Sequence, residues 1–140
     1  MTTVLDKARQ EPLDPQQARV SAMIAYLRRT VLAAPQGCER FHAIFVDDRR
    51  AFLADATLGE GGSAALSVRM RHLFAKALSV GANGLIIAHN HPSGDCRPSA
   101  KDIVSTRRLK EIAVALDIEL IDHLIITESA VYSMRAGGNL

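Results

Sequence analysis

Residues 84–89 read GLIIAH, a short apolar run that ends on a histidine. A run of this length without polar alternation is typical of a strand in the middle of a sheet that is covered on both faces. The chain then passes directly into the polar segment NHPSGDCRPSAKD at residues 90–102. We therefore expect a buried central strand that delivers His89 to a loop at the sheet edge, where α/β folds usually bind their ligands.

Amphipathic segments before and after this strand predict three helices. The first spans about residues 15–33, because Asp14 is a good capping residue, Pro15 suits the first helical position and Gln17 the third. Its expected buried face consists of Val20, Met23, Ile24, Leu27, Val31 and Leu32. The second helix covers residues 67–83, with Met70, Leu73, Phe74, Ala77 and Leu78 on one face. The third begins at Ser99 and reaches about Leu116.

The remaining segments predict strands and turns. Residues 41–56 hold two short apolar runs separated by four charged residues, which indicates a β-hairpin. Residues 58–66, LGEGGSAAL, are expected to form a loop because glycines and small residues favour no regular element. Residues 118–134 read as a strand, a turn at Glu128 and Ser129, and a final strand. This order predicts a single α/β domain over residues 14–140, in which a mixed central sheet is flanked by three helices. A flexible tail is expected over residues 1–13.

Length and composition limit the class of protein. The chain has 140 residues, 48% of them hydrophobic, which suits one well-cored domain and excludes wholesale disorder. Its net charge of +2 does not require a nucleic-acid partner. Two cysteines without a CxxC pattern indicate free thiols in a reducing compartment. The sequence holds neither a secretion signal nor an apolar run of roughly 18 to 20 residues, so we expect a cytoplasmic protein that does not bind membranes.

The histidines of residues 88–102 suggest a divalent metal site. His89 and His91 are two positions apart, so in an extended chain their side chains point to the same face. Catalytic zinc sites commonly combine three histidine or carboxylate ligands with a water, whose pKa falls to about 7. Asp102 is placed to supply the third ligand from the first turn of the next helix. A second interpretation is structural, because Ser99 and Asp102 also fit a helix capping box. The two interpretations are compatible, since a cap would fix the direction of the Asp102 carboxylate.

The spacing of these residues resembles a known motif. His89-x-His91, seven residues, Ser99, two residues and Asp102 look like the JAMM metalloprotease motif of the JAB1/MPN superfamily. The surrounding AHNHPSGD, the following Pro-Ser and the later Asp-His-Leu-Ile at residues 122–125 are similar to the RadC family of bacterial proteins. The similarity covers about residues 40–136, which is most of the chain.

The resemblance implies a fold, a cofactor and a reaction. The fold would be cytidine-deaminase-like, and His89, His91 and Asp102 would bind Zn²⁺. Ser99 would hold the water or stabilise the charge that develops on a tetrahedral intermediate. Members of this superfamily are described as metallopeptidases or isopeptidases, so a peptide or isopeptide substrate is expected. RadC proteins also carry a DNA-repair name.

One part of the JAMM pattern is altered. The mechanism also needs a glutamate on an earlier strand as general base, and an ungapped count places Ala56 there. Glu60, in a glycine-flanked loop, is the favoured substitute. Asp55 is adjacent to position 56, but strand alternation would turn it to the opposite face. The alternative is a catalytically silent zinc-binding module that acts in nucleic-acid or protein interaction.

Other polar residues receive structural interpretations. His123 lies in an apolar strand and is expected to be a hydrogen-bonded core or edge residue. Arg107, Arg108 and Lys110 form a small basic cluster that suits a solvated helix face, with phosphate contact as the alternative. Zinc nucleoside deaminases require H-x-E and a CxxC, which this sequence lacks, so that chemistry is excluded.

Overall fold

A computed structural model describes residues 11–61 and 65–140 of the chain and has its helices and strands in the expected order. In chain order these elements are α1 (Pro15–Leu32), β1 (Glu39–Val46), β2 (Phe52–Gly61), α2 (Ala65–Ser79), β3 (Gly84–Asn90), α3 (Ala100–Ala115), β4 (Glu119–Ile126) and β5 (Val131–Ser133). The predicted single α/β domain is confirmed, and the described residues contain the three expected helices.

The strands form one mixed sheet in the order β2-β1-β3-β4-β5. β3 and β4 run parallel, with α3 as the crossover between them, and the other neighbours are antiparallel. Every residue of β3 is buried, as expected for its apolar sequence. The position of β3 at the centre of the sheet explains why its end can receive side chains from several other elements.

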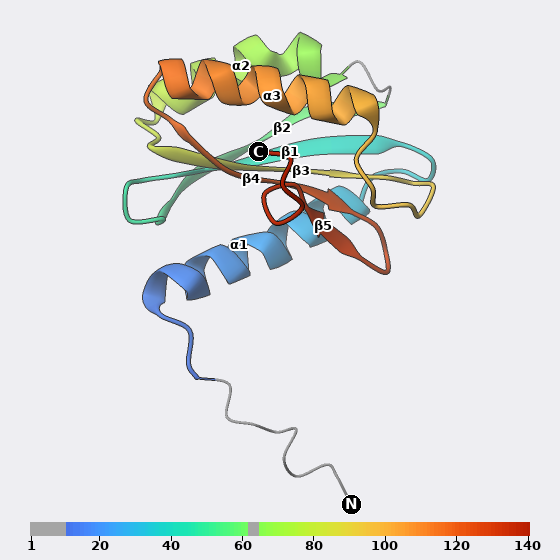
Figure 1. The fold of residues 1–140 in the computed structure, drawn as a ribbon, viewed down its shortest axis with the longest axis horizontal. Coiled ribbons are helices and arrows are strands. Elements are labelled where there is room, and N and C mark those ends of the chain that lie inside the picture. Colours follow the sequence, from blue (N-terminus) through green and yellow to red (C-terminus); the bar gives the residue numbers. More distant parts are fainter. Residues whose placement is uncertain (1–10, 62–64) are drawn as a thin grey trace, which may run out of the picture.

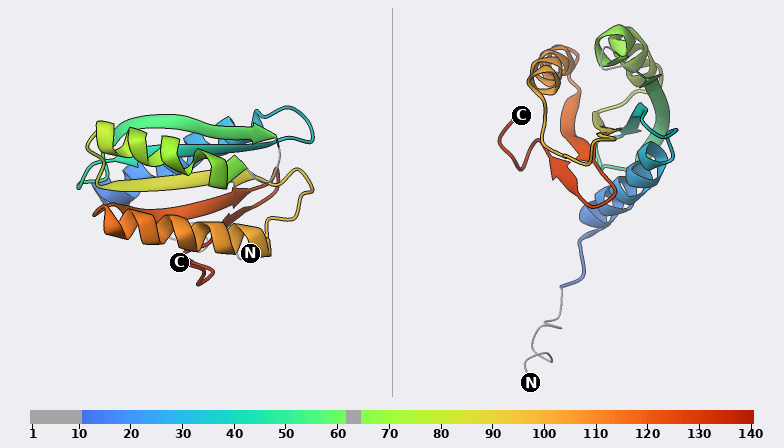
Figure 2. Two further views of the ribbon diagram at one scale, coloured as in Figure 1. Left: turned by 90° about the horizontal axis from the view of Figure 1, so that it is seen from above. Right: turned by 90° about the vertical axis from the view of Figure 1, so that its right-hand side faces the viewer.

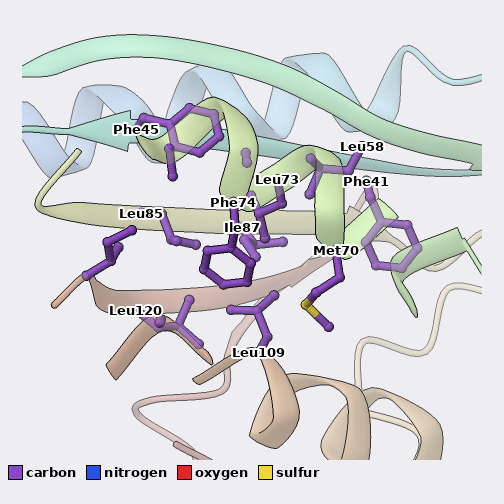
Figure 3. Packing of buried hydrophobic residues seen from close by; sticks show 14 residues of the cluster. Phe41, Phe45, Leu58, Met70, Leu73, Phe74, Leu85, Ile87, Leu109 and Leu120 are labelled. Carbon is purple, nitrogen blue, oxygen red and sulfur yellow. The ribbon is translucent and has the colours of Figure 1, made fainter. Parts of the chain in front are cut away.

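The helices lie on opposite sides of this sheet, with α2 and α3 on one face and α1 on the other (Figures 1 and 2). We call these the α2/α3 face and the α1 face. The larger apolar cluster lies between the sheet and the α2–α3 pair, and includes Phe41, Phe45, Leu73, Phe74, Leu85, Ile87, Leu109 and Leu120 (Figure 3). A second cluster packs α1 against the sheet through Met23, Leu27, Val31, Ile44, Ile86, Leu124 and Ile126. Alternate residues of β1 and β3 therefore pack into two separate hydrophobic cores, one on each face of the sheet.

Two helices start with the capping box that the sequence predicts. At α1, the Asp14 side chain accepts a hydrogen bond from the Gln17 backbone N–H, and the Gln17 side chain accepts one from the Asp14 N–H. At α3, Ser99 and Asp102 make the same reciprocal pair. These bonds satisfy backbone donors that the first turn of a helix otherwise leaves unpaired.

Three expectations about local structure are wrong. The second helix covers Ala65–Ser79 and does not reach residue 83, because the chain leaves the helix at Gly81, whose φ is +67°. β2 continues to Gly61 instead of giving way to a loop at Leu58, because it stays paired with β1 as far as Glu39. Leu58 is buried at an irregularity in this pairing. Leu78 is 58% exposed, since it lies beyond the arc of α2 that Met70 and its helical neighbours turn towards the core.

The predicted tail at residues 1–13 lies almost wholly outside the described residues. Within the described part of the chain, none of the helices combines the length and apolarity that crossing a membrane requires. The cytoplasmic location stays a prediction.

Candidate metal centre

The end of β3 positions two imidazoles. His89 is fully buried and stacks on Phe41 of β1, with ring centroids 4.5 Å apart, so its ring lies on the α2/α3 face. His91 follows the strand, and its backbone N–H donates to the Ile126 carbonyl of β4 at 3.0 Å. The loop then turns back through Gly94, whose φ of +85° suits glycine. This turn brings the start of α3, with Asp102 in its first turn, beside the two histidines.

The structure brings His89, His91 and Asp102 together at one point. The two Nε2 atoms are 3.0 Å apart. The Asp102 carboxylate has Oδ1 3.4 Å from His89 Nε2 and Oδ2 3.2 Å from His91 Nε2. One ligand atom from each residue lies within 4.8 Å of the others, as a shared ion requires. Two imidazoles and one carboxylate form the ligand set typical of a catalytic zinc site, so the residues fit a divalent metal.

Further hydrogen bonds hold two of these candidate ligands. His91 Nδ1 donates to the Asp95 carbonyl at 2.8 Å, which leaves the Nε2 lone pair directed at the cluster. The Asp95 carboxylate in turn binds the Arg97 guanidinium at 2.7 Å. Hydrogen bonds from Arg97 lower the pKa of this exposed carboxyl to about 2. The Asp102 carboxylate accepts from the Ser99 backbone N–H at 2.9 Å, so the helix cap orients the third ligand.

Electrostatics keep Asp102 in its charged form. The carboxylate is mostly buried, with 14% of the side chain exposed. Burial by itself would raise the pKa of the Asp102 carboxyl, but the adjacent His89 imidazole and the hydrogen bonds of the Ser99 cap hold it well below its usual range. A carboxylate that is charged at neutral pH is ready to ligate a cation.

His123 of β4 is a polar neighbour of this cluster. Its ring is completely buried, and Nε2 lies 2.7 Å from His89 Nδ1. Its other nitrogen, Nδ1, lies 2.7 Å from the Thr106 hydroxyl of α3. Burial holds the pKa of His123 well below its usual value. The sequence indicated a satisfied core histidine; that its partner is His89, 34 residues earlier, is visible only in the folded chain.

The acids considered as general bases lie elsewhere. Ala56 packs against the core of the α2/α3 face, the face that carries His89. Glu60 pairs through Oε1 with Arg40 Nε at 2.7 Å, and Arg40 reaches the Thr30 carbonyl of α1. Asp55 accepts hydrogen bonds from Tyr26 of α1 and from His42, both at 2.7 Å. Neither carboxylate is part of the metal cluster in this structure.

Open space lies on two sides of His91. One cavity of about 410 Å³ is lined by Cys38, Asn90, His91, Thr127 and Ser129 among others. Asn90 shapes its wall, because its side chain accepts from the Arg40 backbone N–H and donates to the Cys38 carbonyl. A second cavity, of about 380 Å³, is lined by His91, Ser93, Asp95, Arg97, Pro98 and Ser99. Of the three clustered residues, His91 is the one that lines both cavities.

Comparison with known proteins places these features in a family. The family described as "RadC-like JAB domain" matches residues 17–139. The chain is 33% identical over 143 residues to a UPF0758 protein of Paraburkholderia xenovorans, an alignment that covers 99% of this chain and 56% of the relative. It is 41% identical over 95 residues to a UPF0758 protein of Flavobacterium johnsoniae, covering 68% of this chain and 42% of the relative. The chain thus spans about half the length of the curated relatives it matches.

Proposed function

The chain belongs to the RadC-like JAB domain family, and from this premise we propose that it is a zinc-dependent hydrolase of amide bonds. The observation that carries the proposal is the meeting of His89, His91 and Asp102 at one point, with ligand atoms within 4.8 Å of one another. Peptides or isopeptides are the proposed substrates. The cavities beside His91 support this class, because a peptide bound in either one would lie next to a residue of the cluster.

Each residue of the cluster has a proposed role. His89, His91 and Asp102 hold Zn²⁺, which when bound polarises a carbonyl and activates water as a nucleophile at neutral pH. Ser99 Oγ accepts from the Asp102 N–H at 3.0 Å. In the proposal its hydroxyl proton is donated to the oxygen on which negative charge develops. Ser99 would then connect the helix cap with the reaction, as the sequence pattern allows.

A second candidate is a zinc-binding module without hydrolytic activity. It is favoured by the position of the acids, because Ala56 occupies the expected site of the general base. Glu60 would have to leave Arg40, and Asp55 would have to leave Tyr26 and His42, before either could accept a proton near His89. Such a module would act by binding protein or nucleic acid. Arg107 and Arg108, exposed on α3, would contact phosphates, in keeping with the DNA-repair name of RadC proteins.

Zinc analysis and cleavage assays on the same preparations separate these candidates. The variants are His89→Ala combined with His91→Ala, Glu60→Gln, and Glu119→Gln as a matched control. Glu119 is 53% exposed and pairs with Arg50 at 2.9 Å, much as the 49% exposed Glu60 pairs with Arg40. The hydrolase proposal expects one zinc per chain and cleavage of peptide or isopeptide probes, both lost in the double histidine variant.

The remaining outcomes are equally decisive. Cleavage lost in Glu60→Gln but retained in Glu119→Gln would identify Glu60 as the general base. Zinc bound at one per chain without cleavage of any probe would favour the silent module. A wild-type protein that binds no zinc would refute both candidates and leave a metal-free structural domain.

A further inference from the structure

We infer that Thr106 and His123 are positioning residues of the metal centre, which fix the proton of His89 on Nδ1 and aim its Nε2 lone pair at His91 and Asp102. The inference rests on the proposed metal site, and it assigns a function to two residues outside the ligand set. It follows from an unbroken series of hydrogen bonds that starts at the backbone of α3.

The series starts at an atom that can only accept. The Thr106 hydroxyl lies 2.6 Å from the Asp102 backbone carbonyl, one helical turn earlier. A carbonyl has no proton, so the hydroxyl must donate to it. The Met134 sulfur, 3.6 Å from the same hydroxyl, is a weaker acceptor. A hydroxyl has one proton, so towards any other partner Thr106 Oγ1 acts as an acceptor.

The acceptor role of Thr106 determines which nitrogen of His123 carries a proton, and this in turn determines which nitrogen of His89 does. Because Thr106 Oγ1 accepts, His123 Nδ1, 2.7 Å away, must carry a proton. The ring is completely buried, and its two nitrogens contact a hydroxyl and a second imidazole, so a charged form would lack a compensating anion in direct contact. A neutral ring with its proton on Nδ1 has a lone pair on Nε2. His89 Nδ1, 2.7 Å from that lone pair, must therefore donate.

The result is that both histidine ligands present the same nitrogen. His91 is fixed by the Asp95 carbonyl, and His89 by the Thr106–His123 pair. Two Nε2 lone pairs then face each other at 3.0 Å beside a carboxylate, an arrangement that a bound cation would stabilise. Asp102 lies at both ends of this series of hydrogen bonds. Its backbone carbonyl accepts from Thr106 at the start, and its carboxylate lies beside the two Nε2 atoms at the end.

The chain offers a matched control on the α1 face. His42 is also buried, and its Nδ1 lies 3.0 Å from the Thr57 hydroxyl. Its Nε2 meets the Asp55 carboxylate instead of another imidazole. Removing the hydroxyl of the exposed Thr57 therefore disturbs a threonine–histidine contact that does not touch the metal ligands.

The test measures zinc affinity and the position of the His89 proton. Zinc dissociation constants are determined by chelator competition for wild type, Thr106→Val, Thr106→Ser, His123→Leu, His123→Gln and Thr57→Val. Nitrogen-15 NMR of the metal-free wild type and Thr106→Val reports which ring nitrogen of His89 carries the proton. Thr106→Val keeps the shape of the side chain and replaces the hydroxyl with a methyl group, and it leaves the buried ring at position 123 in place.

We expect Thr106→Val to weaken zinc binding by about tenfold and His123→Leu by roughly 10- to 100-fold, the usual range for the loss of a hydrogen-bond partner of a ligand. Thr106→Ser, which keeps the hydroxyl, and Thr57→Val should bind zinc as the wild type does. His123→Gln, which can still accept from His89, should recover part of the loss. The metal-free wild type should carry the His89 proton on Nδ1, and Thr106→Val should show a mixture of the two tautomers.

Two results would overturn the inference. The first is a His89 proton on Nε2 in the metal-free wild type. The second is wild-type zinc affinity in folded Thr106→Val. Failure of the wild type to bind zinc would refute the proposed function, whereas the tautomer of His89 would still decide whether Thr106 and His123 direct its proton.

Discussion

The two faces of the sheet carry similar polar side chains, but their hydrogen bonds are arranged differently. On the α1 face, buried His42 lies between the Thr57 hydroxyl and the Asp55 carboxylate, and Tyr26 donates to the same carboxylate. On the α2/α3 face, buried His89 lies between a second imidazole and the Asp102 carboxylate. Both groups contain histidine and aspartate, and each lies beside a helix that begins with a capping box.

The difference lies in how many acceptors remain after the internal hydrogen bonds are made. Two donors, the Tyr26 hydroxyl and the His42 ring, meet at one oxygen of Asp55, so this group connects α1 with β1 and β2. At Asp102 the Ser99 N–H orients the carboxylate, and the Asp95 carbonyl accepts from His91 Nδ1, so that a carboxylate oxygen and His91 Nε2 both face the point where His89 Nε2 lies. The same residue types therefore make a structural cluster on one face and a candidate metal centre on the other.

The largest expected difference in zinc affinity is between variants of the two capping boxes, at Asp102 in α3 and at Asp14 in α1. Asp102→Ala should weaken zinc binding by more than about 100-fold, beyond the effect of losing an outer hydrogen-bond partner, because it removes a ligand. Asp14→Ala should leave zinc affinity unchanged and lower the free energy of unfolding by about 1 kcal/mol through loss of the α1 cap. Zinc titration and urea unfolding of both variants measure the contrast. Equal zinc affinities in the two variants would contradict it.

The buried histidine of the α1 face should matter for stability and not for metal. His42→Leu removes the partner of Asp55 and Thr57, so we expect a loss of about 2 kcal/mol in the free energy of unfolding. Zinc affinity should stay at the wild-type value, since His42 turns away from the metal ligands. Chemical denaturation and chelator competition test the two parts separately. A fall in zinc affinity in folded protein would mean that the two faces are coupled.

On the α1 face, Asp55 should make the free energy of unfolding depend on pH. Burial by itself would raise the pKa of Asp55, but hydrogen bonds from Tyr26 and His42 outweigh it and hold the pKa below its ordinary value of 3.8. The stabilisation from this group is therefore complete above pH 3.8 and is lost as the pH falls through the lowered pKa of the folded state. Unfolding free energies measured downwards from pH 6 should fall less steeply in Asp55→Asn than in wild type. Parallel curves would refute the assignment.

The smallest effect is expected at Glu60. Its pair with Arg40 is half exposed, and such pairs contribute roughly 0.2–1 kcal/mol. Glu60→Gln should lower stability by no more than this amount and should leave zinc content unchanged. Thermal unfolding beside Glu119→Gln provides the comparison, because both acids pair with an arginine at the surface. A loss of zinc in Glu60→Gln alone would place its carboxylate in the metal centre after all.

Local patterns were sufficient to predict much of this molecule from its sequence. The apolar run of β3, the capping boxes of α1 and α3, and the spacing of His89, His91 and Asp102 each depend on residues within one strand, turn or helix start. The resemblance to RadC proteins, which the family comparison supports, also depends on a continuous stretch of sequence.

Tertiary structure decided what those patterns leave open. The extension of β2 to Gly61 depends on its pairing with β1, and the partners of Glu60 and Asp55 come from β1 and α1. His123, 34 residues after His89, contacts it directly, and Thr106 of α3 contacts His123. Spacing in the sequence determines which residues share a face of one element, but hydrogen-bond partners across elements exist only once the sheet has brought those elements together.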